Sequence, residues 1–233
     1  CQHSFQQHPT PIASTMPSYK LHAVPGNFRA FKTLIAAEYS GVDVAVAEYD
    51  AAKIKAASPT GKAPILEITN GSSSTTLFGS NAIARHVSRI RRDAGLMGDG
   101  SLEQTAKVDA WLEFCDHEIE LPAQVWVYPI IGYMPYHDAA YAKSKEDLGA
   151  ALAVLEKYLA DGSKRYLVGD QMTLADISIA SALVYPFKLV CDPKYLKPYG
   201  NVVRWFTDCV GQEEFKAVIG DVVMCKKEIA AKR

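Results

Sequence analysis

The sequence of 233 residues lacks several features that would place it in a simple functional class. No apolar run approaches the roughly 20 residues that a membrane-spanning helix needs. The formal net charge is −1, so there is no excess of positive charge to attract nucleic-acid phosphates. No GxxxxGK[ST] stretch is present, which argues against a phosphate-binding loop. We therefore expect no membrane contact, no direct nucleic-acid binding, and no GTPase or kinase activity in this chain.

Cysteine is scarce and scattered, and the six histidines are equally dispersed. No pair has a zinc-binding or CxxC spacing, so we expect reduced thiols, a cytoplasmic protein and no metal site. No cysteine occupies the first strand-to-helix turn, which argues against a redox protein of the thioredoxin or glutaredoxin type. The five cysteines are Cys1, Cys115, Cys191, Cys209 and Cys225.

Residues 1–15 are polar and contain proline, and they show no helical or strand periodicity. They lack the apolar core and the basic start of a secretory signal. We expect a disordered leader or an expression remnant here, with Met16 as the natural start.

Residues 16–94 alternate between strand and helix patterns, in the order β-α-β-α-β-β-α. Pro25-Gly26 separates the first strand from the first helix, and Gly41 is placed to end that helix. This order is typical of a thioredoxin-like domain with a mixed sheet and helices on both faces. The predicted elements are strand 20–24, helix 27–39, strand 42–49, a short helix or turn 50–58, strand 63–68, a hairpin turn over 69–76 with strand 77–78, and helix 80–90 with Ser80 as its N-cap.

Strand patterns disappear after a short Gly-rich linker over 95–100, and residues 101–225 predict an all-helical domain. Ser101 and Gln104 form a capping-box pattern for a long helix, which Pro122 should bend or end. Further helices are expected over 146–160, from Thr173 onward, and after Pro198. The fold class is thus α/β followed by all-α.

Asp176 lies at the head of a helix that is apolar around most of its circumference. A lone buried carboxylate is costly, but Thr173 stands three residues before it. The pair can exchange hydrogen bonds with each other's backbone N–H groups as a capping box. We expect Thr173 and Asp176 to have a structural role.

Several stretches resemble the glutathione S-transferase fold, which has a thioredoxin-like N-terminal domain and a helical-bundle C-terminal domain. They are "GKAPILEI", "SNAIARHVS" and "LVGDQMTLADISIA". The longer stretches "FRAFKTLIAAEYSG" and "FKAVIG", the latter followed by "MCKK", are similar to the amino-terminal domain of the elongation factor 1-gamma family. A proline that opens a strand cannot donate to the sheet, and the resemblance implies a cis bond before Pro64. It also implies that residues 226–233 begin a Lys-rich linker.

The resemblance to elongation factor 1-gamma implies a scaffold that needs no cofactor. Such a domain anchors the nucleotide-exchange subunit of elongation factor 1B, and so serves elongation factor 1A indirectly. Contact with aminoacyl-tRNA synthetases is implied as well. A homodimer, as in the transferases, is a further expectation.

The alternative function is an active S-transferase that uses glutathione or a conjugate such as trypanothione. Glutathione transferases ionise the thiol with a Tyr on the first strand, or with a Ser or Cys at the start of the first helix. By resemblance those positions hold Ala23, and Gly26 or Asn27. The remaining catalytic candidates are the Asn27 amide and the Arg29 cation. Each also has an ordinary alternative, since Asn27 can simply cap the helix and Arg29 can be a surface or salt-bridged residue.

The rest of the glutathione site is partly retained by resemblance. Ala63, before Pro64, can pair its backbone with the peptide, and Lys62 can reach a carboxylate. Ser80 and the N–H of Asn81 can hold the γ-glutamyl carboxylate at a helix start, although Ser80 can equally be a plain cap. Gly79 replaces the acidic residue that is usual before this Ser. The resemblance therefore leaves glutathione as a possible ligand and does not imply efficient turnover.

Overall fold

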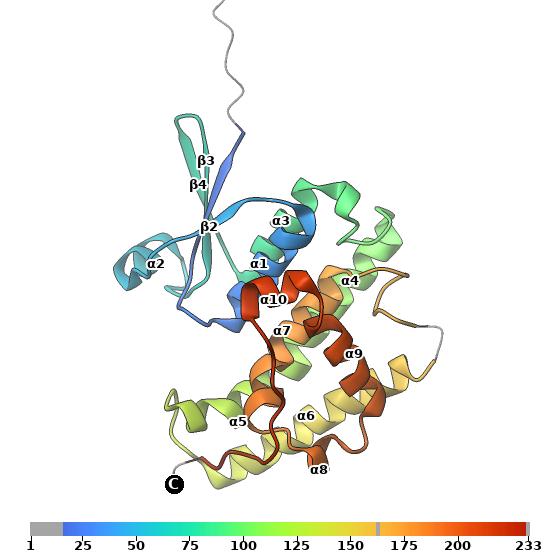
Figure 1. Ribbon diagram of the computed structural model, residues 1–233. Coiled ribbons are helices and arrows are strands. Elements are labelled where there is room, and N and C mark those ends of the chain that lie inside the picture. The colour runs from blue at the N-terminus through green and yellow to red at the C-terminus, as the bar shows by residue number, and fades with distance from the viewer. Residues whose placement is uncertain (1–15, 162–163, 232–233) are drawn as a thin grey trace, which may run out of the picture.

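The computed structural model describes residues 16–161 and 164–231, which form an α/β part followed by a helical part (Figure 1). The predicted leader over 1–15 lies outside the described residues. In the described ranges, no helix is long and apolar enough to cross a membrane. The predicted fold class, α/β followed by all-α, is confirmed.

The first part is a four-stranded sheet with strand order β2-β1-β3-β4. β1 pairs with β2 in parallel, and the β1–β3 and β3–β4 pairs are antiparallel. Helices α1 and α3 cover the face of the sheet that is turned toward the helical part, and α2 lies on the other side (Figure 1). This is the predicted thioredoxin-like topology. Its elements are β1 (Ser18–His22), α1 (Phe28–Ser40), β2 (Val44–Val46), α2 (Ala51–Ala57), β3 (Ile65–Asn70), β4 (Ser73–Phe78) and α3 (Ser80–Ile90).

The hairpin between β3 and β4 is tighter than predicted. Asn70 pairs with Ser73, so Gly71 and Ser72 alone make the turn, with Gly71 at φ 58°. The prediction over 69–76 was too wide because the Ser and Thr residues there are also common in turns. In the sheet, β-branched Thr75 pairs with Ile68 on the neighbouring strand, a position that suits its shape.

Helix α1 begins and ends as its sequence predicts. The Asn27 side-chain oxygen accepts a hydrogen bond from the Arg29 backbone N–H at 2.9 Å. At the other end Gly41 adopts the left-handed conformation, φ 60°, and its N–H returns to the last turn. The helix therefore starts directly at the Pro25-Gly26 turn.

The helical part is organised around α7, which packs against α1, α4, α5 and α9. Buried apolar residues form a core that continues from the sheet into this part, from Leu21 and Ile35 to Leu112 and Leu183. The elements are η1 (Arg92–Ala94), α4 (Leu102–Phe114), the π-helical segment η2 (Cys115–Glu120), α5 (Leu121–Ile131), α6 (Asp138–Leu159), α7 (Leu174–Leu189), α8 (Pro193–Leu196), α9 (Gly200–Val210) and α10 (Glu213–Ile219).

Two local predictions in this part were not met in full. Of the two alternatives predicted for Pro122, a bend or an end, the end is excluded, because Pro122 lies in the first turn of α5, where the missing N–H has little cost. Helix α4 instead passes into α5 through the π-helical segment. The box at the start of α4 is only half formed: Ser101 Oγ accepts from Gln104 N, but the Gln104 side chain bonds to Asp99. The Asp99 carboxylate accepts from the Ser101 N–H in its place.

The capping box at the start of α7 is present as predicted. Asp176 is fully buried, and its carboxylate accepts hydrogen bonds from the Thr173 N–H and hydroxyl at 3.1 and 2.9 Å. It also accepts from the Leu167 N–H at 2.9 Å and the Trp205 indole at 3.0 Å. Burial raises the pKa of Asp176, and these hydrogen bonds oppose the rise. One carboxylate thus joins α7, α9 and the segment before α7.

The C-terminal segment folds back from α10 along the helical part (Figure 1). Its Cys225 N–H donates to the Phe187 carbonyl, and its Ile229 N–H donates to the Leu189 carbonyl. Glu228 accepts from Trp126, Tyr141 and Lys145 at 2.6–3.1 Å. Burial would raise the pKa of Glu228, but hydrogen bonds from Lys145, Tyr141 and Trp126 outweigh it and lower the pKa. Glu228 and Ile229, which fall in the predicted linker, therefore contact the helical part.

Replacing Asp176 with Ala should unfold the protein more easily, because four buried donors lose their acceptor. We expect a loss of about 3–5 kcal/mol in the free energy of unfolding, measured by urea denaturation. Asp208→Ala, an exposed change on α9, is the matched control and should cost less than about 0.5 kcal/mol. Equal effects of the two substitutions would contradict the structural role of Asp176.

Candidate functional site

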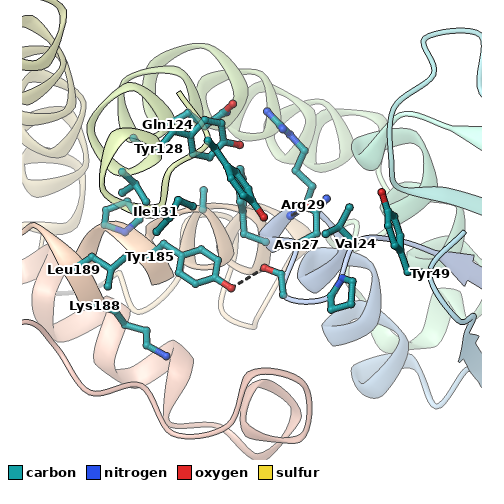
Figure 2. A pocket seen from close by; sticks show the side chains of 18 residues that line it. Val24, Asn27, Arg29, Tyr49, Gln124, Tyr128, Ile131, Tyr185, Lys188 and Leu189 are labelled. Carbon is teal, nitrogen blue, oxygen red and sulfur yellow. Dashed lines mark hydrogen bonds between the residues drawn. The ribbon is translucent and has the colours of Figure 1, made fainter. Parts of the chain in front are cut away.

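A cavity of about 640 Å³ opens between the two parts of the chain. One side is formed by the β1–α1 turn and Tyr49, and the other by α5, the turn that follows it and α7. Figure 2 shows Val24, Asn27, Arg29 and Tyr49 facing the helical part across this space. Its lining residues are Val24, Pro25, Gly26, Asn27, Phe28, Arg29, Tyr49, Ala123, Gln124, Val127, Tyr128, Ile131, Tyr133, Ala182, Tyr185, Pro186, Lys188 and Leu189.

The two predicted catalytic residues, Asn27 and Arg29, both line the cavity, and both have partners within the protein. The Asn27 oxygen caps α1. The Arg29 Nε donates to the Glu120 carboxylate at 2.8 Å, and Glu120 is almost completely buried. The ordinary alternatives for both residues, a cap and a salt bridge, are thus what the structure contains.

The tip of the β1–α1 turn is held by the helical part. The Tyr185 hydroxyl of α7 donates to the Gly26 carbonyl at 2.6 Å (Figure 2). Gly26 has φ 73°, and a Cβ there would lie 3.0 Å from this hydroxyl, so the position favours glycine. Ala23, which by resemblance stands at the Tyr position of the transferases, is buried. The turn therefore presents backbone atoms and the Asn27 amide, and no hydroxyl or thiol side chain of its own.

The predicted glutathione-binding residues do not line this cavity. The bond between Ala63 and Pro64 is cis, as the family resemblance implies. Pro64 is buried at the start of β3, and Lys62 is exposed. The complete predicted set is Lys62, Ala63, Pro64, Ser80 and Asn81.

The start of α3 differs from the prediction. Gly79, with φ 85°, occupies the N-cap position, and no side chain caps the helix. Ser80 is the first helical residue, so its prediction as the N-cap was wrong. A glycine without side-chain oxygen takes this place because the backbone there has a positive φ, which disfavours serine. The Asn81 side chain turns toward α1, where it accepts from the Lys32 ammonium at 2.8 Å.

A buried charge network, which the sequence analysis missed, lies behind the cavity. The Lys32 side chain is completely buried, and its ammonium lies 3.1 Å from the Glu120 carboxylate. The Asp116 carboxylate lies 3.8 Å from the same ammonium and accepts from the Asn81 amide at 2.8 Å. Lys32 and Asn81 belong to the first part of the chain, and Asp116 and Glu120 to the second. The network therefore joins the two parts.

Cys115, Asp116 and Glu120 bring three ligand atoms within 4.8 Å of one another, the one such group in the described ranges. The positive charge at this place is already supplied by the Lys32 ammonium. Burial raises the pKa of the Cys115 thiol, which keeps it protonated and a poor metal ligand. We assign the two carboxylates of this group to ion pairing with Lys32.

The sequence carried some signal for the missed residues. Lys32 stands on the apolar stripe of α1, four residues after Phe28 and three before Ile35, and a cation there needs a buried partner. That partner cannot be identified from sequence, since Glu120 is 88 residues away. Tyr128 and Tyr185 lie in strongly apolar helices. A tyrosine in such a helix is ordinarily interpreted as a buried core residue, so neither was recognised as part of a cavity.

The chain matches the models of two protein domains. Residues 17–89 match the glutathione S-transferase N-terminal domain, and residues 114–213 match the glutathione S-transferase C-terminal domain. A solved glutathione S-transferase III structure in apo form has a TM-score of 0.72 at 24% identity, covering 89% of this chain and 98% of that one. Together these findings give the chain the two-domain glutathione S-transferase fold.

Relatives with higher sequence identity make the resemblance more specific. The chain is 39% identical over 217 residues to elongation factor 1-gamma-A of Xenopus laevis, covering 89% of this chain and 48% of that protein. Human elongation factor 1-gamma is 36% identical over 222 residues, covering 91% and 48%. The chain thus spans about half the length of these relatives. The predicted resemblance to elongation factor 1-gamma is confirmed.

A solved structure agrees with this resemblance at the level of the fold. The glutathione S-transferase-like domain of elongation factor 1-gamma from Saccharomyces cerevisiae has a TM-score of 0.78 at 19% identity. The similarity covers 94% of this chain and 100% of that domain.

Glu120→Ala should destabilise the protein strongly, because it leaves the Lys32 ammonium buried with much less negative charge. We expect a loss of about 3–5 kcal/mol in the free energy of unfolding, measured by urea denaturation. Glu118→Ala, an exposed change on the same segment, should be nearly neutral. Combining Lys32→Met with Glu120→Leu should recover most of the loss, since no buried charge then lacks a partner. A small effect of Glu120→Ala would show that water solvates Lys32.

Proposed function

We propose that this chain is a scaffold domain of the elongation factor 1-gamma type, which acts in translation elongation in the cytoplasm. By analogy with its relatives, it anchors the nucleotide-exchange subunit of elongation factor 1B and so assists elongation factor 1A indirectly. Aminoacyl-tRNA synthetases are further proposed partners. The similarity to elongation factor 1-gamma proteins over about nine tenths of the chain supports this proposal.

The hydrogen bonds of Asn27 and Arg29 are the observation that favours a scaffold over an enzyme. A transferase must stabilise a thiolate, whose parent thiol has a pKa near 8.5, with a donor at the start of α1. Here the Asn27 oxygen is fixed by the cap, and the Arg29 Nε is bonded to Glu120. Because Glu120 neutralises much of the Arg29 charge, little positive potential is left for a thiolate.

A second candidate function is S-transfer with glutathione or trypanothione. The open cavity beside the start of α1 favours it. In this proposal the Ala63 backbone pairs with the peptide, and Lys62 with a carboxylate. The N–H groups of Ser80 and Asn81 at the start of α3 bind the γ-glutamyl carboxylate.

Asn27→Ala should lower the free energy of unfolding by about 1 kcal/mol, because α1 loses its cap. It should leave the conjugation of glutathione to chlorodinitrobenzene at the background rate of the unaltered chain. We also expect millimolar glutathione to raise the unfolding temperature little. Rapid conjugation that disappears in both Asn27→Ala and Ser80→Ala would instead establish the transferase.

The scaffold function predicts a stable complex between this chain and the amino-terminal region of the nucleotide-exchange subunit. Isothermal titration calorimetry with the two purified proteins should show saturable binding with a defined stoichiometry. Glu118→Ala, an exposed change outside the cavity, should bind as the unaltered chain does, because it alters neither the fold nor the cavity lining. No binding at micromolar concentrations would overturn the scaffold proposal.

A further inference from the structure

The cavity between the two parts continues outward as an apolar rim. Tyr49 stands at one edge, and Ile131 and Tyr133 stand at the edge formed by α5 and its following turn. These three side chains are 49%, 45% and 69% exposed, which leaves a substantial apolar surface at the mouth of the cavity. A ligand enclosed by the cavity would leave this rim uncovered. A longer ligand that enters the cavity and leaves across the rim would cover both.

The lining has a one-sided charge. All eighteen lining residues belong to the described part of the chain, and they include Arg29 and Lys188 but neither Asp nor Glu. Glu120 balances Arg29 from behind the wall. Lys188 has no ion-pair partner within residues 16–161 and 164–231, and lies beside Leu189 and Tyr185 at the edge of the cavity (Figure 2). An acidic ligand would find a complementary charge there, whereas a basic one would be repelled.

The cavity wall also contains a hydrogen-bond donor without an acceptor. The Gln124 side-chain nitrogen is buried and has no partner among the described residues. Gln124 lies on α5 beside Tyr128 and lines the cavity. Buried polar atoms are nearly always hydrogen-bonded in folded proteins, so an unpaired donor at a cavity indicates a place for an acceptor. A carbonyl or carboxylate oxygen of a ligand would supply it.

The residue types resemble those of protein-binding surfaces. Four tyrosines line the cavity, at positions 49, 128, 185 and 133. Tyrosine and arginine are enriched among the residues that carry most of the energy of protein–protein binding. The walls are held together by the bond from Tyr185 to Gly26 and by the Arg29–Glu120 pair. A preformed site of this kind lowers the entropic cost of binding an extended segment.

We propose that this cavity and its rim are a docking site for an acidic peptide segment of a partner protein, which inserts one aromatic or large aliphatic side chain. The apolar side chain enters between Tyr185, Ile131 and Val127. A neighbouring carboxylate pairs with Lys188, and a backbone carbonyl accepts from Gln124. The rim residues Tyr49 and Tyr133 cover the flanking backbone. This assignment rests on the proposed scaffold function and specifies one surface through which it acts.

The test is a selection of random peptides displayed on phage, carried out in parallel on the unaltered chain and on Ile131→Glu. Ile131→Glu places a carboxylate at the rim, where it repels acidic peptides without disturbing buried packing. Peptides enriched only on the unaltered chain should combine Asp or Glu with one aromatic or large aliphatic residue. A synthetic copy of one such peptide should lose about tenfold or more in affinity when that residue becomes Ala.

Matched variants locate the binding. The selected peptide should bind about tenfold more weakly to Lys188→Glu, since an attraction becomes a repulsion. Leu102→Glu and Lys197→Glu make the same chemical changes at exposed positions outside the cavity, and should leave the affinity within about twofold. Circular dichroism and urea unfolding confirm that each variant is folded. Binding should also weaken with added salt.

Three outcomes would overturn the docking site. One is no enrichment over Ile131→Glu, and another is enrichment of basic peptides. The third is binding of 4-phenylbutyrate that responds to Ile131→Glu and Lys188→Glu while no peptide binds, because the cavity would then be a small-molecule site. Calorimetry with the nucleotide-exchange subunit separates the two proposals. If that subunit binds but no peptide is selected, the scaffold proposal is supported and the docking site is rejected. If peptides are selected but the subunit does not bind, the docking site is supported and the scaffold proposal is rejected.

Discussion

The buried ion pair between Lys32 and Glu120 is the constraint on which the arrangement of the two parts depends. An ammonium without exposed surface is stable only where a carboxylate and further acceptors surround it, and here those groups come from both parts of the chain. Separating the parts would expose or strand these charges. The apolar core that continues from the sheet into the helices adds non-directional attraction, but the charges specify the register of α1 against the π-helical segment.

This constraint also decides what the cavity can do chemically. Glu120 accepts from Lys32 through one carboxylate oxygen and from Arg29 through the other. The Arg29 cation, which lies nearest the start of α1, is therefore paired across the contact between the two parts. A transferase needs an unengaged donor at that place to hold a thiolate. The chain therefore keeps the cleft of the transferase fold, while the charged group nearest the start of α1 is paired across the contact between the two parts. An accessible cleft lined by tyrosines and apolar side chains is suited to binding.

Much of the fold was predictable from sequence because its signals are local. The Pro25-Gly26 turn, the Asn27 and Gly41 caps, and the box formed by Thr173 and Asp176 each involve residues a few positions apart. The candidate site was predicted less well. Sequence placed Asn27 and Arg29 at the cleft, but their partners are set by contacts between distant segments, such as Glu120. Ser80 was wrongly predicted as the N-cap of α3 because serine is common at that position. The sequence does not show that Gly79 has the positive φ that makes it the N-cap instead.

The bond from Tyr185 to Gly26 shows how the same interface shapes the surface of the cleft. The turn before α1 is the one part of the thioredoxin-like domain that α7 holds by a side chain, among the hydrogen bonds described. Since the Gly26 carbonyl is fixed from the opposite wall, the two sides of the cavity cannot separate without losing this bond and disturbing the Arg29–Glu120 pair. The β1–α1 turn and α7 are consequently held at a fixed spacing on the two sides of the cavity. A surface assembled from two domains in this way can recognise a partner only while both domains are folded and joined, which ties recognition to the integrity of the buried charges.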